Sequence, residues 1–283
     1  MSKDDKLAPR EAPHELAMTN SDNSDSDDRH SDHDAQQGPR TRLTDTLGGG
    51  WLEAQLLLTT LATGVLDAVS FGEYAVFASN QTGNVILLPA HAIGLVGKYR
   101  PPALVTAPPL LSTGLSLVFF LLCAFISGQI GARVGHCRRG WFLTTGVIQA
   151  GLLLLVATLT VTGVLESRGQ ANAIPVSLLA TVGGLQVSLA RCSGIQEVPT
   201  AMLTGPMVDF LTLPTLFSLK APHTRDLRAL YLLLFVLGIV LGSLAHSFSG
   251  PAAAMYLGFG LRCIGIVVLW FQPAKKQATG RCA

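Results

Sequence analysis

The stretch that decides the fold reads LATGVLDAVSFGEYAVFASNQTGNVILL and covers residues 61–88. Two carboxylates, Asp67 and Glu73, lie inside an apolar run, and that run breaks at the polar segment 80–84 before apolar sequence resumes. A carboxylate at membrane depth costs at least about 2.5 kcal/mol on insertion scales, so it is usually retained for a function. The stretch therefore indicates a membrane helix that carries a polar site.

The chain as a whole is more apolar than a soluble domain. Of its 283 residues, 49% are hydrophobic and only 13% are charged, and its mean hydropathy is +0.43. About 25% charged residues is usual for soluble domains. The apolar runs are each near the roughly 20 residues that cross a bilayer as a helix, and they lack the alternation of barrel strands. We therefore predict an all-α fold, a polytopic helical bundle whose main partner is the lipid bilayer.

Several function classes find no support in the sequence. The net charge is +2 with no basic stripe, so we expect no nucleic-acid partner. The five cysteines lack the spacing of metal ligands, so we expect no metal site. No hydrolase triad, phosphate-binding loop or haem motif is present, and we therefore expect neither an enzyme nor a cofactor.

The composition divides the chain into three regions. Residues 1–50 are acidic and serine-rich and contain too little apolar surface to offset the entropy of ordering, so we expect a disordered tail. This tail lacks the apolar core of a signal peptide, and we place it on the cytoplasmic side. Residues 51–272 form the membrane domain, and residues 273–283 form a short basic tail.

Two halves of the membrane domain share a pattern. Gly64-Val-Leu-Asp67 followed by Gln81-Thr-Gly-Asn84 is echoed by Gly183-Gly-Leu-Gln186 followed by Leu203-Thr-Gly-Pro206, about 120 residues later. Each half then adds two long apolar segments, as in duplicated transporter folds. The pattern predicts two internal repeats, residues 51–165 and 173–272.

Two topologies fit the apolar segments. If all eight segments cross, the halves are parallel; if the short segments 83–97 and 195–219 do not cross, six helices form two inverted triplets. Basic residues concentrate in cytoplasmic loops, and the six-helix arrangement puts most of the Lys and Arg on the side of the tail. We favour about six transmembrane helices plus two short broken segments, with eight crossings as the alternative.

The motifs themselves resemble those of a known family. Residues 64–71 follow the pattern G-x-x-D-A-x-S-F, residues 76–85 read VFASNQTGNV, and parts of both motifs recur at 184–186 and 203–205. This resembles the YoaK family of polytopic membrane proteins of unknown function, over residues 51–272. The resemblance implies about six membrane helices and no established catalytic activity. The long acidic tail and Pro206 depart from the family pattern.

Six residues make up the candidate substrate or ion site: Asp67, Thr82, Gly83, Asn84, Gln186 and Arg262. A guanidinium in mid-bilayer needs an acid or an aqueous cavity, and the acids available to Arg262 are Asp67, Glu73 and Asp209. The segment Thr82–Asn84 is able to open a half-helix whose free N–H groups face an anionic substrate. Gln186 takes the place of Asp67 in the second half, which breaks the charge symmetry of the site.

Each of these interpretations has a structural alternative. Asp67 can be locked to Arg262 or to backbone donors at a helix break, and Thr82 can be an ordinary helix cap. Two functions follow. The first is a multi-pass membrane transporter or permease for a small molecule or ion, with these residues near the midplane. The second is a membrane scaffold that binds partners without transport, in which the polar residues only fix helix packing.

Overall fold

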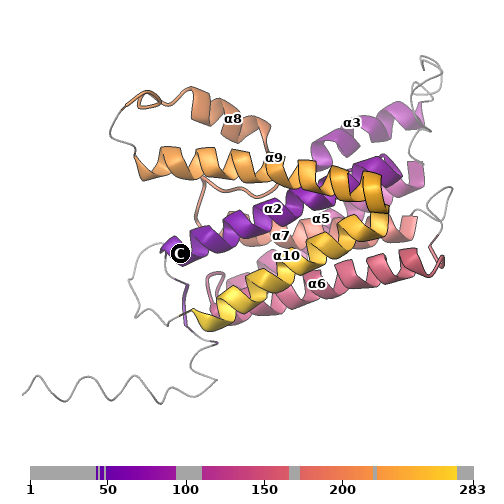
Figure 1. Cartoon of the computed structure of the whole chain (residues 1–283), viewed down its shortest axis with the longest axis horizontal. Coiled ribbons are helices and arrows are strands. Elements are labelled where there is room, and N and C mark those ends of the chain that lie inside the picture. Colours follow the sequence, from indigo (N-terminus) through magenta and orange to yellow (C-terminus); the bar gives the residue numbers. More distant parts are fainter. Residues whose placement is uncertain are drawn as a thin grey trace, which may run out of the picture. The chain divides into compact units, whose positions relative to one another are not determined.

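The computed structural model describes residues 43, 45–47, 49–93, 110–165, 173–218 and 222–272. Within these ranges eight helices and no strand are defined, which confirms the predicted all-α fold. Most of the predicted tail, residues 1–50, and all of residues 273–283 lie outside the described residues. The helices are α2 (Gly49–Tyr74), α3 (Gln81–Ala92), α5 (Leu110–Val134), α6 (Arg139–Val161), α7 (Ala173–Cys192), α8 (Thr204–Leu211), α9 (His223–Ser249) and α10 (Pro251–Phe271) (Figure 1).

Six of these helices are long and apolar enough to cross a membrane: α2, α5, α6, α7, α9 and α10. The other two are too short. At 1.5 Å per residue, the 12 residues of α3 span about 18 Å and the 8 residues of α8 about 12 Å, against about 30 Å of hydrocarbon. The chain is therefore a multi-pass membrane protein with six spans and two short segments.

One end of the bundle, here called the first face, gathers the start of α2 and three other segments. The amide of Leu47 donates to the carbonyl of Cys137 at 3.0 Å, which joins the lead-in of α2 to the loop between α5 and α6. Arg139 donates to the carbonyl of Gln272 at 2.8 Å, and Sγ of Cys137 lies 3.8 Å from the carbonyl oxygen of Ser193. The end of α10 and the turn after α7 therefore lie on the same face.

Two contacts between α2 and α9 show how these helices run from the first face to the opposite end of the bundle, here called the second face. Near their starts, His223 of α9 lies 2.8 Å from Glu53 of α2, on the first face. Near their ends, His246 lies 3.0 Å from Glu73, on the second face. The two helices are thus parallel, and α2, α6 and α9 run from the first face to the second while α5, α7 and α10 return. Figure 1 shows α8 and α3 at opposite ends of the bundle, beside α9 and α5 respectively. The six-crossing prediction is confirmed over the eight-crossing alternative.

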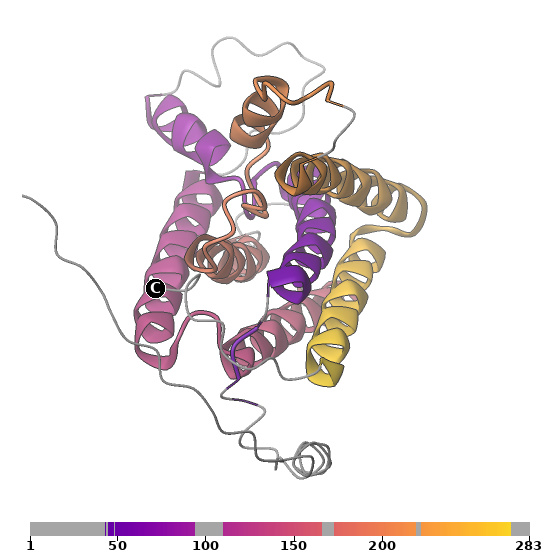
Figure 2. The same ribbon diagram turned by 90° about the vertical axis from the view of Figure 1, so that its left-hand side faces the viewer.

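The closest helix pairs are α2 with α9, α5 with α7, and α6 with α10 (Figure 2). Glycines bring two of these pairs into backbone contact. A Cβ atom added to Gly64 would lie 2.4 Å from the carbonyl oxygen of Phe235, and one added to Gly184 would lie 2.3 Å from that of Phe120. Small residues at such positions let membrane helices approach closely.

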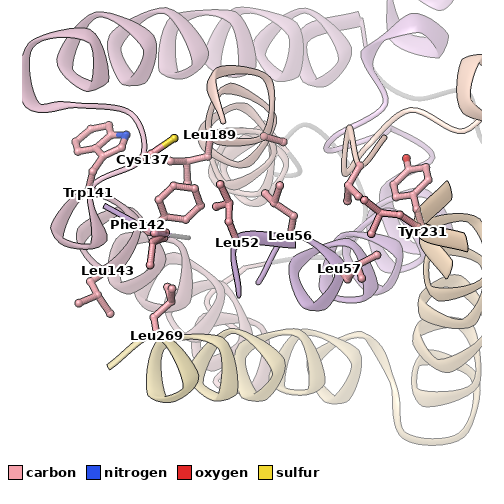
Figure 3. Close-up of a cluster of buried hydrophobic side chains, with 14 of the residues drawn as sticks. Leu52, Leu56, Leu57, Cys137, Trp141, Phe142, Leu143, Leu189, Tyr231 and Leu269 are labelled. Carbon is pink, nitrogen blue, oxygen red and sulfur yellow. The ribbon is translucent and has the colours of Figure 1, made fainter. Parts of the chain in front are cut away.

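Buried apolar side chains form two clusters. The first apolar cluster lies toward the first face (Figure 3) and includes Leu52, Leu56, Trp141, Phe142, Leu189, Tyr231 and Leu269. The second apolar cluster lies toward the second face and includes Leu66, Val69, Tyr74, Leu153, Val156, Leu179 and Met255. A group of buried polar residues lies between the two apolar clusters.

Candidate functional site

A chain of hydrogen bonds crosses the bundle between the two apolar clusters. Arg262 of α10 donates through Nη1 to Oε1 of Gln186 on α7 at 2.6 Å. Gln186 donates through Nε2 to the hydroxyl of Thr59 on α2 at 2.9 Å, and that hydroxyl donates to the carbonyl of Leu56 at 2.9 Å. Three helices from the two halves of the chain are joined in this way.

A small cavity lies beside this chain of bonds. It has about 10 Å³ of space for the centre of a water-sized sphere, which is room for about one water molecule. Its polar wall consists of five residues, here called the polar layer: Gln55, Thr59, Gln149, Gln186 and Arg262. The apolar remainder of the wall is Phe142, Gly146, Leu189 and Ile266.

Several polar atoms of this layer are buried without a hydrogen-bond partner. They are Nε of Arg262, both amide atoms of the Gln149 side chain, and Oε1 of Gln55. Arg262 is 4% exposed and Gln149 is 0% exposed. Buried polar groups in proteins are nearly always hydrogen-bonded, so each of these groups calls for an explanation such as a bound ligand or water.

The buried guanidinium has no acidic partner in the described part of the chain. No carboxylate there lies within 4.0 Å of Arg262. Asp67 binds Ser79 instead, and Glu73 pairs with His246. The suggested pairing of Asp67 with Arg262 is therefore wrong, and the charge of Arg262 faces only amides, a hydroxyl and the cavity.

The polar layer is closed off toward both faces by the apolar clusters. The order of side chains from the first face to the second is Phe142, Gln149, Leu153 along α6, and Leu269, Arg262, Met255 along α10. The same order, Leu189, Gln186, Leu179, holds along α7. An occupant of the cavity would consequently be shielded from water on both sides.

Asp67 belongs to a different network, at the break between α2 and α3. Its Oδ1 accepts the amide of Ser79 at 2.9 Å, and its Oδ2 accepts the hydroxyl of Ser79 at 2.6 Å. Ser70, one turn further on, accepts the amide of Ala78 at 3.2 Å. The carboxylate thus lies where α3 begins, at the positive end of its dipole, and satisfies backbone donors there. Of the two structural alternatives for Asp67, the structure therefore has the second, an acid locked to backbone donors at a helix break.

Asn84 holds the same loop from the other side. Its amide donates to the carbonyl of Phe77 and to Oε1 of Gln81, both at 2.7 Å, and its Oδ1 accepts the amide of Phe77 at 3.2 Å. The hydroxyl of Ser116 on α5 donates to the same carbonyl at 3.0 Å. Asn84 is fully buried, and its side chain is occupied by structural contacts.

The structure divides the predicted site residues into separate groups. It brings Gln186 and Arg262 together, and it places Asp67 and Asn84 around the loop 75–80. Gly83 lies against the ring of Phe77, since an added Cβ would be 2.8 Å from that ring. Thr82 is exposed.

Sequence reasoning missed three members of the polar layer: Gln55, Thr59 and Gln149. A usable signal existed for Gln149, which lies midway along the apolar segment that forms α6. An amide at that depth needs a partner for the same reason as Arg262 does. Gln55 and Thr59 come before the stretch 61–88 and belong to neither of its motifs.

Comparison with known proteins yields one match. A family model described as "Protein of unknown function (DUF1275)" matches residues 55–268, which include all six spans in whole or in large part. No curated protein and no solved structure matches the chain. Since the matched region covers most of the sequence, the chain belongs to the DUF1275 family.

Proposed function

We propose that this protein is a small-solute transporter or permease without enzymatic activity, and that the polar layer is its substrate site. The observation that carries the proposal is the set of unpartnered polar groups around a cavity between two apolar clusters. Buried ionisable residues in membrane helices usually mark substrate or ion pathways. A site closed toward both faces is what an occluded step of alternating access requires.

The arrangement of the helices supports the predicted internal repeats. Exchanging α2 with α7, α5 with α9, and α6 with α10 maps the close pair α2–α9 onto the close pair α7–α5 and leaves the pair α6–α10 in place. The short helices α3 and α8, which would also exchange, lie at opposite faces. This is the pattern of an inverted duplication, which is common in transporters.

The distribution of arginine supports a cytoplasmic first face. All arginines of the described loops and helix ends lie on that face: Arg133, Arg138, Arg139, Arg191, Arg225 and Arg228. Cytoplasmic loops carry such an excess. The predicted cytoplasmic N-terminal tail precedes α2 and would lie on the same side.

Cysteine labelling tests this orientation. Val164 lies on the exposed turn after α6 at the second face. In intact cells a membrane-impermeant maleimide should label the Val164→Cys variant more strongly than it labels the wild-type protein. Arg133→Cys, at the exposed end of α5 on the first face, should react only after permeabilisation. The opposite pattern of reactivity would place the first face outside the cell.

Gln149→Leu tests the transport function. Both amide atoms of Gln149 are buried without partners, so an apolar side chain of similar size should leave stability unchanged or raise it by about 1 kcal/mol. If the amide binds substrate, flux into proteoliposomes should nevertheless fall about tenfold or more, the equivalent of about 1.4 kcal/mol. The measurement is uptake of a solute panel by vesicles with wild-type, variant or no protein.

Thr145→Val provides the matched control on the same helix. Thr145 is also buried, but its hydroxyl donates to the carbonyl of Trp141 at 2.8 Å and does not line the cavity. Its flux should equal that of the wild type. Equal uptake by empty and protein-containing vesicles across the panel would refute the transporter proposal.

A second candidate function is the membrane scaffold. The network around Asp67 and Asn84 favours it, because buried polar residues there serve only to hold a loop. A scaffold predicts that Gln149→Leu changes stability alone. Flux lost in a variant that unfolds no more easily than the wild type would therefore exclude the scaffold as the whole function.

A further inference from the structure

We infer that the polar layer binds a small monovalent anion of about the size of a water molecule, such as a halide. This inference rests on the proposed function, because it names the substrate class of the same site. It is carried by the charge of Arg262, by the hydrogen-bond donors beside it, and by the size of the cavity.

The charge of the site comes first. Arginine stays protonated in proteins, and Arg262 is 4% exposed near the middle of α10. The one hydrogen bond defined for its guanidinium goes to a neutral acceptor, Oε1 of Gln186. Taking an ion out of water costs several kcal/mol, which is repaid only by an opposite charge in good geometry. With no carboxylate of the described chain within 4.0 Å, a bound anion is the partner that completes the site.

The donors facing the cavity fit an anion. Nε of Arg262 and Nε2 of Gln149 are buried and unpartnered, and both residues line the cavity. An anion accepts hydrogen bonds from N–H groups of both kinds, and bonds to a charged group are the stronger ones. A cation would instead meet the guanidinium, and a neutral solute would leave its charge uncompensated. The same groups therefore select against these two solute classes.

The size of the cavity limits the anion further. Space for the centre of about one water-sized sphere, about 10 Å³, suits a monatomic anion better than a carboxylate with a carbon chain. Phe142, Gly146, Leu189 and Ile266 form the apolar wall beside the polar groups. Chloride and bromide are accordingly the probes of choice.

Thermal unfolding of the purified protein in detergent tests the inference at constant ionic strength. Replacing gluconate by chloride or bromide should raise the Tm of the wild type in a saturable way, since a ligand that binds only the folded state stabilises it. Gln149→Leu should raise the half-saturating chloride concentration at least tenfold. Arg133→Gln, which removes an exposed arginine at the end of α5, should leave it unchanged.

Each outcome separates this inference from the transporter proposal. The same Tm in chloride and gluconate for the wild type overturns the anion site, as does a chloride effect that Gln149→Leu does not alter. Saturable chloride binding without uptake of chloride or of any other solute of the panel by proteoliposomes leaves the anion site standing and refutes transport. Uptake of a neutral or cationic solute without chloride binding supports transport and overturns the anion site.

Discussion

Gly64→Ala is expected to lower the free energy of unfolding by about 3 kcal/mol, at the upper end of the usual cost of overpacking. An added Cβ would lie 2.4 Å from the carbonyl oxygen of Phe235, 2.9 Å from the amide nitrogen of Ile239 and 3.0 Å from Cα of Gly238. All three are backbone atoms, so no side-chain rotation relieves the clash. The helices α2 and α9 must separate, and the packing around the contact is lost with them.

The contact is reciprocal, because glycines of α9 also lie against the backbone of α2. A Cβ on Gly238 would lie 2.3 Å from the carbonyl oxygen of Leu61, and one on Gly242 would lie 2.8 Å from Cα of Val65. The pair Gly238 and Gly242, spaced four residues apart, thus forms a small-residue contact within the chain. Gly238→Ala should accordingly be about as harmful as Gly64→Ala.

Gly151→Ala on α6 is the control for this prediction. Gly151 is exposed in a helix, and nothing lies within 4 Å of an added Cβ. Because alanine favours helix more than glycine does, this variant should be as stable as the wild type or slightly more so. Denaturation in mixed micelles, followed by circular dichroism, measures both effects. Equal stability of Gly64→Ala and Gly151→Ala would show that α2 and α9 do not pack this closely.

The helices were predictable because the bilayer imposes a simple rule. A span needs about 20 apolar residues, and a charge bias orients the loops, so hydropathy and arginine positions lead to six spans and to two segments that do not cross. The short helices α3 and α8 lie within the polar break and the segments 83–97 and 195–219 that were predicted not to cross. Their placement at opposite faces follows once the number of crossings is known.

The site was predictable only in part. Depth along a helix can be read from sequence and pointed to Arg262, while the repeated pattern pointed to Gln186; both side chains are buried. Which helices face one another cannot be read in the same way, so the partner of each residue was open. Asp67 was assigned to the site because of its charge, yet its carboxylate reaches Ser79, 12 residues along the chain. The donors come from the helix break between α2 and α3, which was one of the two structural alternatives for Asp67.

Asp67→Ala is expected to be the most harmful single change at the break between α2 and α3. It leaves the amide and the hydroxyl of Ser79 without the acceptors they have now, at 2.9 and 2.6 Å, in a buried position. Each unsatisfied buried donor costs about 1–3 kcal/mol, so the loss of two acceptors should lower the free energy of unfolding by about 2–6 kcal/mol. Denaturation in mixed micelles, compared with the wild type, measures the loss.

Two further variants separate the structural role of Asp67 from a role in binding. Asp67→Asn keeps one carbonyl oxygen for the amide of Ser79, so its loss of stability should be smaller than that of Asp67→Ala. Ser79→Ala removes only the hydroxyl, and in a double-mutant cycle with Asp67→Ala the two losses should be less than additive, because they share one contact. Halide binding by Asp67→Asn should equal that of the wild type, since its carboxylate is bound to the loop and not to the polar layer. A stable Asp67→Asn protein that has lost halide binding would instead place this acid in the substrate pathway.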